Sequence, residues 1–380
     1  MRYGRFLSKK YALELSGSRG GGVDVAGESR SSDHFDYIDA LRGYAILGVM
    51  IVHTGGLSSV GLVNETAWGA RGVQLFFVVS ALTLAMSWHS RQDGAGPFFV
   101  RRLFRIAPIF WLAIAYYTLT ASQSASLWKV LASVTFLHAL YPTTVSPSLV
   151  PGGWSVSDEA LFYVAFPFLV ATLTTWTRSA IALGVSMGIS AWWRGHGVDY
   201  VESFGYAQAV ASEFVFLHPI EQLPAFAAGF VAFHTIRNAA LERVRYLGEA
   251  ALVAGLLMLV WQFSRDVHHI SRVSFCLCII VSSIGLGAGR YLVNAAIIHI
   301  GRISYSAYFV HFALLATADG FAAQFAPGAP AFAVAFSFVL ACTIAISTVT
   351  YSAVERPLIK LGRRLLRAPS NDPITAPTAV

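Results

Sequence analysis

The amino-acid sequence predicts an all-α fold, a polytopic membrane helix bundle of about ten transmembrane helices, on three observations. Of the 380 residues, 56% are hydrophobic and only 12% are charged. A soluble domain carries roughly 25% charged residues, so this chain has too few charges to cover a surface exposed to water. The mean hydropathy is +0.59, and several hydrophobic runs reach the roughly 20 residues that are needed to cross a bilayer.

Each expected span is one of these hydrophobic runs. They cover residues 37–56, 73–88, 104–121, 157–176, 179–193, 208–235, 247–264, 273–289, 303–323 and 330–351. The run at 127–141 is too short to span comfortably, and whether it is re-entrant, interfacial or spanning is left open. Our interpretation places it in an outer loop, without a full crossing.

Basic residues predict the orientation, because cytoplasmic loops carry an excess of lysine and arginine. If 127–141 does not cross, the basic groups after the second, fourth, sixth, eighth and tenth spans all lie on one face. We therefore expect a multi-pass protein of the bacterial inner membrane with both termini in the cytoplasm. Residues 1–36 predict a flexible N-terminal tail, 37–367 one transmembrane domain, and 368–380 a disordered C-terminal tail.

Composition also restricts the partners. The net charge of +7 is explained by the cytoplasmic basic groups, so we expect no nucleic-acid partner. The segment 358–367 sets leucines against Lys360, Arg363, Arg364 and Arg367, a pattern typical of an interfacial helix that faces anionic membrane lipids. The three cysteines have no CxxC spacing, which predicts neither a disulfide framework nor a metal site. The oligomeric state is unreadable, and a homo-oligomer is compatible with the sequence.

Ionisable residues inside the expected spans are costly, and each therefore requires an explanation. Arg42 and His53 share roughly one face of the first span, about 16 Å apart along the helix axis. This arrangement is typical of a pathway or a reaction site. The alternatives are that Arg42 extends to the inner interface and that His53 makes a helix–helix hydrogen bond.

Three arginines, Arg101, Arg102 and Arg105, begin the third span on the cytoplasmic side. Guanidinium groups match phosphate oxygens, so this cluster predicts a site for a phosphate-rich ligand; the alternative is a simple topological anchor. Asp158 and Glu159 open the fourth span, either as helix-capping acids with Ser155 or, for Glu159, as the partner of an imidazole. His311 lies about 13 Å into the ninth span. Glu213 and Glu221 add two carboxylates in the sixth span.

Taken together, these segments resemble the integral-membrane acyltransferase 3 family, of the O-antigen and exopolysaccharide O-acetyltransferase type. The resemblance is carried by six segments in the family's order, which extend over nearly all of residues 36–365: IDALRGYAILGVMIVH, RGVQLFFVVSALTL, FFVRRLFRIAPIFWL, WSVSDEALFYVAFPFL, LGAGR to GRISYSAYFVH, and VERPLIKLGRR.

The resemblance implies roles for particular residues. It makes His53 catalytic and Arg42 required, and it assigns Arg102 and Arg105, with Arg101 beside them, to a coenzyme A donor. Glu159 matches the family's glutamate. Tyr305 and His311 match its Ser-Tyr-Ser-x-Tyr-x-x-His run, and we expect them, with Trp154, to contact substrate. The sequence departs from the family at Gln74 (commonly Asp), at Ser80-Ala81-Leu82 (commonly Ser-Gly-Phe) and at Ala160-Leu161 (commonly Glu-Gln), which leaves the acceptor open.

The expected activity is transfer of an acyl group, by expectation acetyl, from cytoplasmic acyl-CoA to a hydroxyl of a sugar or polysaccharide precursor. Acetyl-CoA would be a donor substrate, with no permanently bound cofactor. His53 would act as the general base, or would form an acyl-histidine, and Glu159 would orient the imidazole. Arg42 would either polarise the thioester or bind phosphate. Trp154, Tyr141 and the 142–156 loop would stack on sugar rings. The competing interpretation is a proton-coupled transporter of a polar solute.

Overall fold

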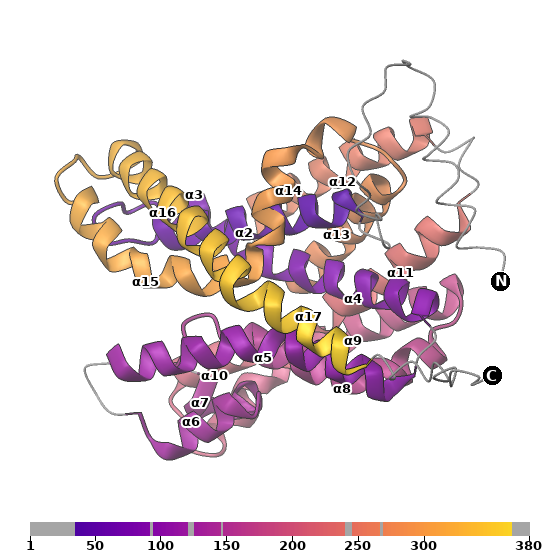
Figure 1. Ribbon diagram of the computed structural model, residues 1–380, viewed down its shortest axis with the longest axis horizontal. Coiled ribbons are helices and arrows are strands. Elements are labelled where there is room, and N and C mark those ends of the chain that lie inside the picture. Colours follow the sequence, from indigo (N-terminus) through magenta and orange to yellow (C-terminus); the bar gives the residue numbers. More distant parts are fainter. Residues whose placement is uncertain are drawn as a thin grey trace, which may run out of the picture.

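The computed structural model describes residues 35–91, 94–120, 125–145, 147–239, 245–266 and 269–366, and within these ranges every regular element is helical (Figure 1). This confirms the all-α class. The predicted tail 368–380 and all but the last two residues of the predicted tail 1–36 lie outside the described residues.

The longer helices are connected by loops and by shorter helical segments. The longer ones are α2 (Asp36–Gly55), α4 (Gly72–Arg91), α5 (Ala95–Thr120), α8 (Trp154–Thr172), α9 (Trp176–Glu202), α10 (Gln208–Leu217), α11 (Pro219–Asn238), α12 (Arg245–Arg265), α13 (Ile270–Gly285), α15 (Ser304–Ala322) and α16 (Ala329–Thr350). The shorter ones are α3 (Val63–Thr66), η1 (Ala67–Arg71), α6 (Leu127–Val134), η2 (His138–Leu140), α7 (Pro142–Val145), η3 (Arg290–Leu292), α14 (Ala295–Arg302), the π-helical turn η4 (Tyr351–Glu355) and α17 (Arg356–Leu365).

Five helical stretches in the described part of the chain are long and apolar enough to cross a membrane. They are Val63–Arg91, Trp154–Thr172, Gln208–Asn238, Tyr246–Arg265 and Ala329–Leu365, and the shorter apolar helix Ile270–Gly285 adds to them. The chain is therefore a multi-pass membrane protein. Nine of the ten predicted runs fall mainly on one helix each, the run 208–235 is divided between two, and the number of ten spans stays a prediction.

Two predicted segments are interrupted in the structure. The run 208–235 breaks between α10 and α11, where His218 has an extended backbone (ψ 143°) because it precedes Pro219, and the residue before a proline is disfavoured in a helix. The segment 127–141 is divided into α6 and η2, with Phe136 between them at a φ of 61°. An eight-residue helix is only about 12 Å long, so α6 does not cross the bilayer.

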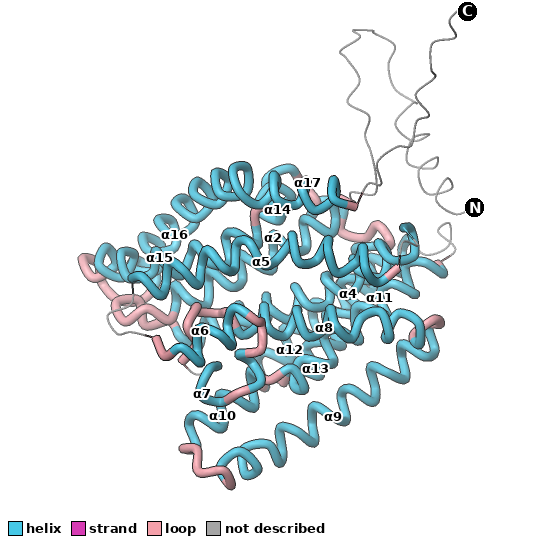
Figure 2. Tube along the Cα trace, turned by 60° about the horizontal axis from the view of Figure 1, so that its bottom comes forward, coloured by secondary structure: helices cyan, strands magenta, loops and turns pink. Residues whose placement is uncertain are grey.

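The helices pack through small residues. α2 contacts α4, α14 and α15, and α11 contacts α4, α9 and α13; α9 runs along the lower edge of Figure 2, away from α15 and α16. Gly229 allows α11 to approach α4, because a Cβ there would lie 2.4 Å from the carbonyl oxygen of Val78. Gly301 likewise allows α14 to approach α2, because a Cβ at this position would overlap the carbonyl oxygen of Asp39. Inside a membrane the hydrophobic effect does not drive helices together, so they associate through close packing at small residues such as these glycines.

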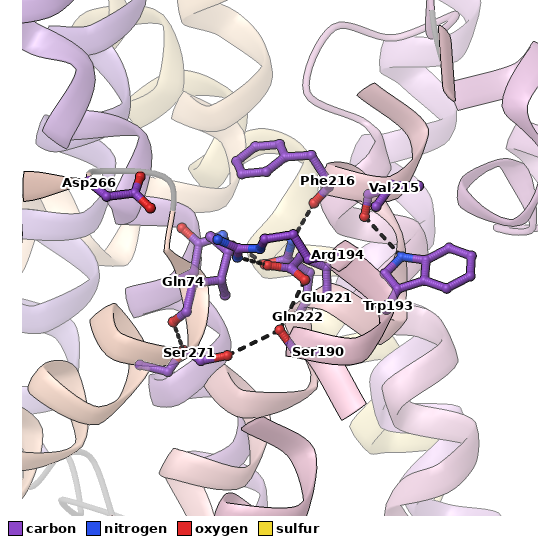
Figure 3. Close-up of polar contacts among 12 residues, drawn as sticks. Gln74, Ser190, Trp193, Arg194, Val215, Phe216, Glu221, Gln222, Asp266 and Ser271 are labelled. Atoms are coloured by element: carbon purple, nitrogen blue, oxygen red, sulfur yellow. Dashed lines mark hydrogen bonds and ion pairs between the residues drawn. The ribbon is translucent and has the colours of Figure 1, made fainter. Parts of the chain in front are cut away.

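A buried polar cluster joins α4, α9, α11 and α13 (Figure 3). Glu221 forms an ion pair with Arg194 and accepts a hydrogen bond from the Ser190 hydroxyl at 3.0 Å. Gln74 Nε2 donates to Gln222 Oε1 at 2.7 Å. The position where the resembled family commonly has aspartate is thus occupied by one half of a neutral amide pair.

This cluster accounts for one of the two carboxylates that the sequence places in the sixth span. Glu221 is the counter-charge of Arg194 on α9. Glu213, the other carboxylate of this run, is exposed on α10. Glu221 therefore has a structural role in the packing of α9 on α11.

Candidate active site

A cavity of about 90 Å³ lies between α2, α4, α5, α8 and α15. It brings together five of the predicted site residues, Arg42, Arg102, Arg105, Glu159 and Tyr305, which come from four helices. The rest of its wall consists of Val73, Phe76, Phe77, Val79, Ser80, Thr83, Ile106, Ser155, Val156, Tyr163, Ser304 and Tyr308. Residues that are more than 250 positions apart in the chain thus share one apolar chamber that contains a few charged groups, which is the usual form of a small-molecule site.

The two arginines of α5 reach this cavity because they are three positions apart, adjacent on one helix face. The guanidinium of Arg102 lies 6.0 Å from the ring of Phe98 and 5.9 Å from that of Tyr163. Its Nε is buried, and it has no hydrogen-bond partner among the described residues. The two aromatic rings position this guanidinium, and its buried Nε–H group is still available to donate a hydrogen bond. Such a group is suited to bind an anion.

Arg105 is held by a partner that the sequence analysis missed. Its guanidinium forms an ion pair with Glu355 and lies 5.9 Å from the centre of the Tyr305 ring. Glu355 is almost completely buried in the π-helical turn η4, and its second oxygen accepts a hydrogen bond from Ser306 Oγ at 3.0 Å. The sequence shows Glu355 as a single glutamate at the start of a strongly basic segment, but it does not indicate which residue pairs with this glutamate.

Glu159 is fixed on α8 by two short hydrogen bonds. The hydroxyls of Ser80 and Tyr163 both donate to its Oε1 at 2.6 Å. The capping explanation for the acids of this helix is wrong, because α8 begins at Trp154 and Gly153 is its N-cap, with no capping side chain. Glu159 therefore faces the cavity as a hydrogen-bond acceptor, and its carboxylate is held by one donor from α4 and one from its own helix.

Asp158, the neighbouring acid, has a different environment. Its side chain is 1% exposed, and neither carboxylate oxygen has a hydrogen-bond partner in the described part of the chain. Because a buried ion without a partner is very costly, Asp158 is accommodated most easily as the neutral acid.

The imidazole pair lies beside the cavity and does not line it. His53 is in the last turn of α2, with its ring centre 5.5 Å from that of His311 and 4.5 Å from that of Phe312. His311 is completely buried. Its Nδ1 lies 3.0 Å from the carbonyl oxygen of Ala307, so Nδ1 carries the proton, and the buried Nε2 has no hydrogen-bond partner within the described residues.

Tyr308 separates this pair from the cavity. It lines the cavity, and its ring centre is 6.1 Å from that of His311. Its hydroxyl donates to the carbonyl oxygen of Gly152 at 3.1 Å and accepts a hydrogen bond from Ser155 Oγ at 3.0 Å. Gly152 has a φ of 72°, and a Cβ at this position would meet the side chains of both Tyr308 and Phe312. The glycine is thus required to form this end of the cavity.

The two other predicted site residues lie outside the cavity wall. Arg101 is half-buried on α5 and makes interactions of its own. Trp154 is half-buried, with its ring edge-to-face against Phe77 at 6.2 Å. The exposed aromatic surface is instead formed by Tyr141 and Trp128, whose ring centres are 5.0 Å apart.

Comparison with known proteins identifies the family. A family model described as an acyltransferase domain matches residues 35–351, which is most of the chain. The chain belongs to the acyltransferase 3 family. This acyltransferase is 28% identical over 316 residues to the exopolysaccharide production protein ExoZ of Rhizobium meliloti, with 78% of this chain and 91% of that protein covered. It is 25% identical over 385 residues to the acyltransferase MdmB of Streptomyces mycarofaciens, with 89% and 95% covered. No solved structure matches it.

The family membership and the helices together make this protein a membrane O-acyltransferase. The cavity is its candidate active site, because it holds the arginines and the glutamate through which the family resemblance was recognised. Its charge is in keeping with an anionic ligand: three arginines face it or border it, against the carboxylates of Glu159 and Glu355.

Proposed function

We propose that this acyltransferase moves an acyl group, by expectation acetyl, from cytoplasmic acyl-CoA across the bacterial inner membrane to a hydroxyl of a sugar or polysaccharide precursor. The observation that carries the proposal is the cavity in which Arg42, Arg102 and Arg105 converge from α2 and α5. A site with several guanidinium groups is suited to the phosphates of coenzyme A. The ExoZ protein of Rhizobium meliloti, named for exopolysaccharide production, supports a polysaccharide-type acceptor.

The donor would extend along α2. Its phosphates would be bound by Arg42, Arg102 and Arg105, and its thioester would reach His53, about 16 Å further along the same helix. This separation supports a role for Arg42 at the phosphate end, because its side chain would not reach a carbonyl beside His53. Rotation of the Tyr308 side chain would open the path from the cavity to the imidazoles.

His53 is the general base of the proposed reaction. It takes the proton of the acceptor hydroxyl while the hydroxyl oxygen forms a bond to the carbonyl carbon of the thioester. The C–S bond then breaks, and the imidazolium returns the proton to the departing thiolate of coenzyme A. His311 lies next to His53, and its unpartnered Nε2 would accept a hydrogen bond from a second hydroxyl of the acceptor, because the reacting hydroxyl gives its only proton to His53.

The test uses purified full-length protein in liposomes with acetyl-CoA that is labelled in the acetyl group. The wild-type protein should transfer the label to a polysaccharide precursor or slowly to water, whereas a carrier would do neither. His53→Ala should lower the rate by about 10²–10⁴-fold, the usual contribution of a general base, and should still bind coenzyme A. His196→Ala is the matched control, because His196 is exposed on α9. Full transfer by the His53 variant would remove this histidine from the chemistry.

A further inference from the structure

The amphipathic helix α17 packs against the arginine-bearing start of α5. The contact is close at Gly362, where an added Cβ would lie 2.8 Å from the Cβ of Phe104. Phe104 precedes Arg105 in the sequence, so the contact brings α17, including the residue after Gly362, next to the segment of α5 that bears the arginines. That residue is Arg363. The Arg105–Glu355 ion pair also connects the two segments, because Glu355 immediately precedes α17.

Arg363 lies in a cluster of like charges. Arg91, Arg101 and Arg105 are all close enough to repel it electrostatically. Arg363 is exposed and makes no ion pair with a carboxylate of the described residues. Arg105 already has its counter-charge in Glu355, and Arg101 makes interactions of its own, whereas Arg363 on α17 and Arg91 on α4 have no ion pair among the described residues. An anion bound beside these two arginines would offset the repulsion between the like charges.

The members of this cluster differ in depth. Arg105 lines the cavity, while Arg91 and Arg363 are exposed and do not line it. A ligand that extends out of the cavity on this side would therefore meet Arg102 and Arg105 first and Arg363 afterwards. Coenzyme A has its phosphates in the corresponding order: the pyrophosphate follows the pantetheine arm, and the 3′-phosphate on the ribose lies further out.

We propose that Arg363, together with Arg91, binds the 3′-phosphate of the acyl-CoA donor at the cytoplasmic mouth of the cavity. This inference rests on the proposed function, since it takes acyl-CoA as the donor. It gives α17 a role in substrate binding as well as in contact with lipid. Only one face of α17 has this role. Arg364, the next residue, lines a separate shallow groove with Ser352, Arg356, Pro357 and Lys360.

The experiment compares the binding of coenzyme A and of dephospho-coenzyme A, which lacks the 3′-phosphate, by calorimetry. It uses purified full-length protein in a neutral detergent, where no anionic lipid is present. A hydrogen-bonded ion pair with one phosphate predicts about tenfold tighter binding of coenzyme A by the wild-type protein. Arg363→Ala should reduce this preference to about onefold, while Arg364→Ala should keep it. Arg363→Gln provides the same measurement if the alanine variant does not purify in a folded state.

The outcomes separate this inference from the proposed function. If both nucleotides bind but the wild-type protein does not distinguish them, or if Arg363→Ala retains the full preference, the 3′-phosphate is not bound here and the inference is wrong. In that case Arg363 faces lipid headgroups, and the donor assignment is unaffected. If neither nucleotide binds to the folded wild-type protein, the donor assignment and the inference both fail.

Discussion

The Arg105–Glu355 ion pair should contribute strongly to stability, and Glu355→Gln is the substitution that tests this. The Glu355 side chain is 1% exposed and that of Arg105 is 20% exposed, so the pair is largely shielded from water. Removal of one member of a buried pair typically costs 3–5 kcal/mol, because the other charge is left without its partner. Glutamine has nearly the volume of glutamate and can still accept the hydrogen bond from Ser306. The guanidinium of Arg105 also stays partly exposed to water, which lowers the cost of losing its counter-charge. We therefore expect a loss of about 2–3 kcal/mol in the free energy of unfolding.

The assay is a double-mutant cycle on protein in detergent micelles, with unfolding followed by denaturant titration. Glu355→Gln, Arg105→Met and the double variant are compared with the wild-type protein. The double variant should be more stable than the sum of the single losses predicts, by about 2 kcal/mol. Asp319→Asn is the control, because this partly exposed carboxylate is hydrogen-bonded to Ser58 at 2.7 Å but makes no ion pair with any described residue. Additivity within about 0.5 kcal/mol would show that the two charges are not coupled and would refute the reasoning.

Two further substitutions test the packing around the site. Gly152→Ala combines a positive φ with a Cβ 2.8 Å from the Phe312 ring, and it should cost about 1–3 kcal/mol in stability and lower the transfer rate. Gly205→Ala, at a φ of 87° in open space, measures backbone strain alone, so equal melting temperatures for the two variants would contradict a role for the contact. Glu221→Gln removes the counter-charge of Arg194 and should cost about 1–3 kcal/mol, since Glu221 is 1% exposed but Arg194 is 31% exposed. Its rate of acyl transfer per folded molecule should be unchanged, and a loss of transfer in the folded variant would link this cluster to the reaction.

Much of the architecture could be predicted from the sequence, because hydrophobic runs report directly on which segments leave water. The break before Pro219 was visible as a local signal, but the continuous hydrophobicity of the run concealed it. The division of 127–141 depends on Phe136, whose left-handed backbone no residue preference indicates. Local rules therefore predicted where the helices lie better than where they end.

The candidate site was predicted in part, for a physical reason. The convergence of Arg42, Arg102 and Arg105 followed from charges that the sequence places near one side of the membrane, and the structure brings them to one cavity. Glu355 was missed because its pairing with Arg105 joins residues 250 positions apart, and no spacing rule applies across such a separation. The Tyr308 side chain lies between the imidazole pair and the cavity, and this separation is a result of tertiary packing that the sequence does not indicate.

The π-helical turn that contains Glu355 has a mechanical consequence. α16, the turn and α17 form a single helical rod of 37 residues, which Figure 1 shows as one almost continuous ribbon. Its apolar part, residues 329–354, measures about 39 Å at 1.5 Å per residue, more than the roughly 30 Å thickness of the hydrocarbon layer, and the basic helix α17 follows it. Its tilt must therefore respond to bilayer thickness. Since Glu355 and Arg363 belong to the same rod, lipids with shorter or longer acyl chains should alter how the protein holds its donor without any contact at the cavity itself.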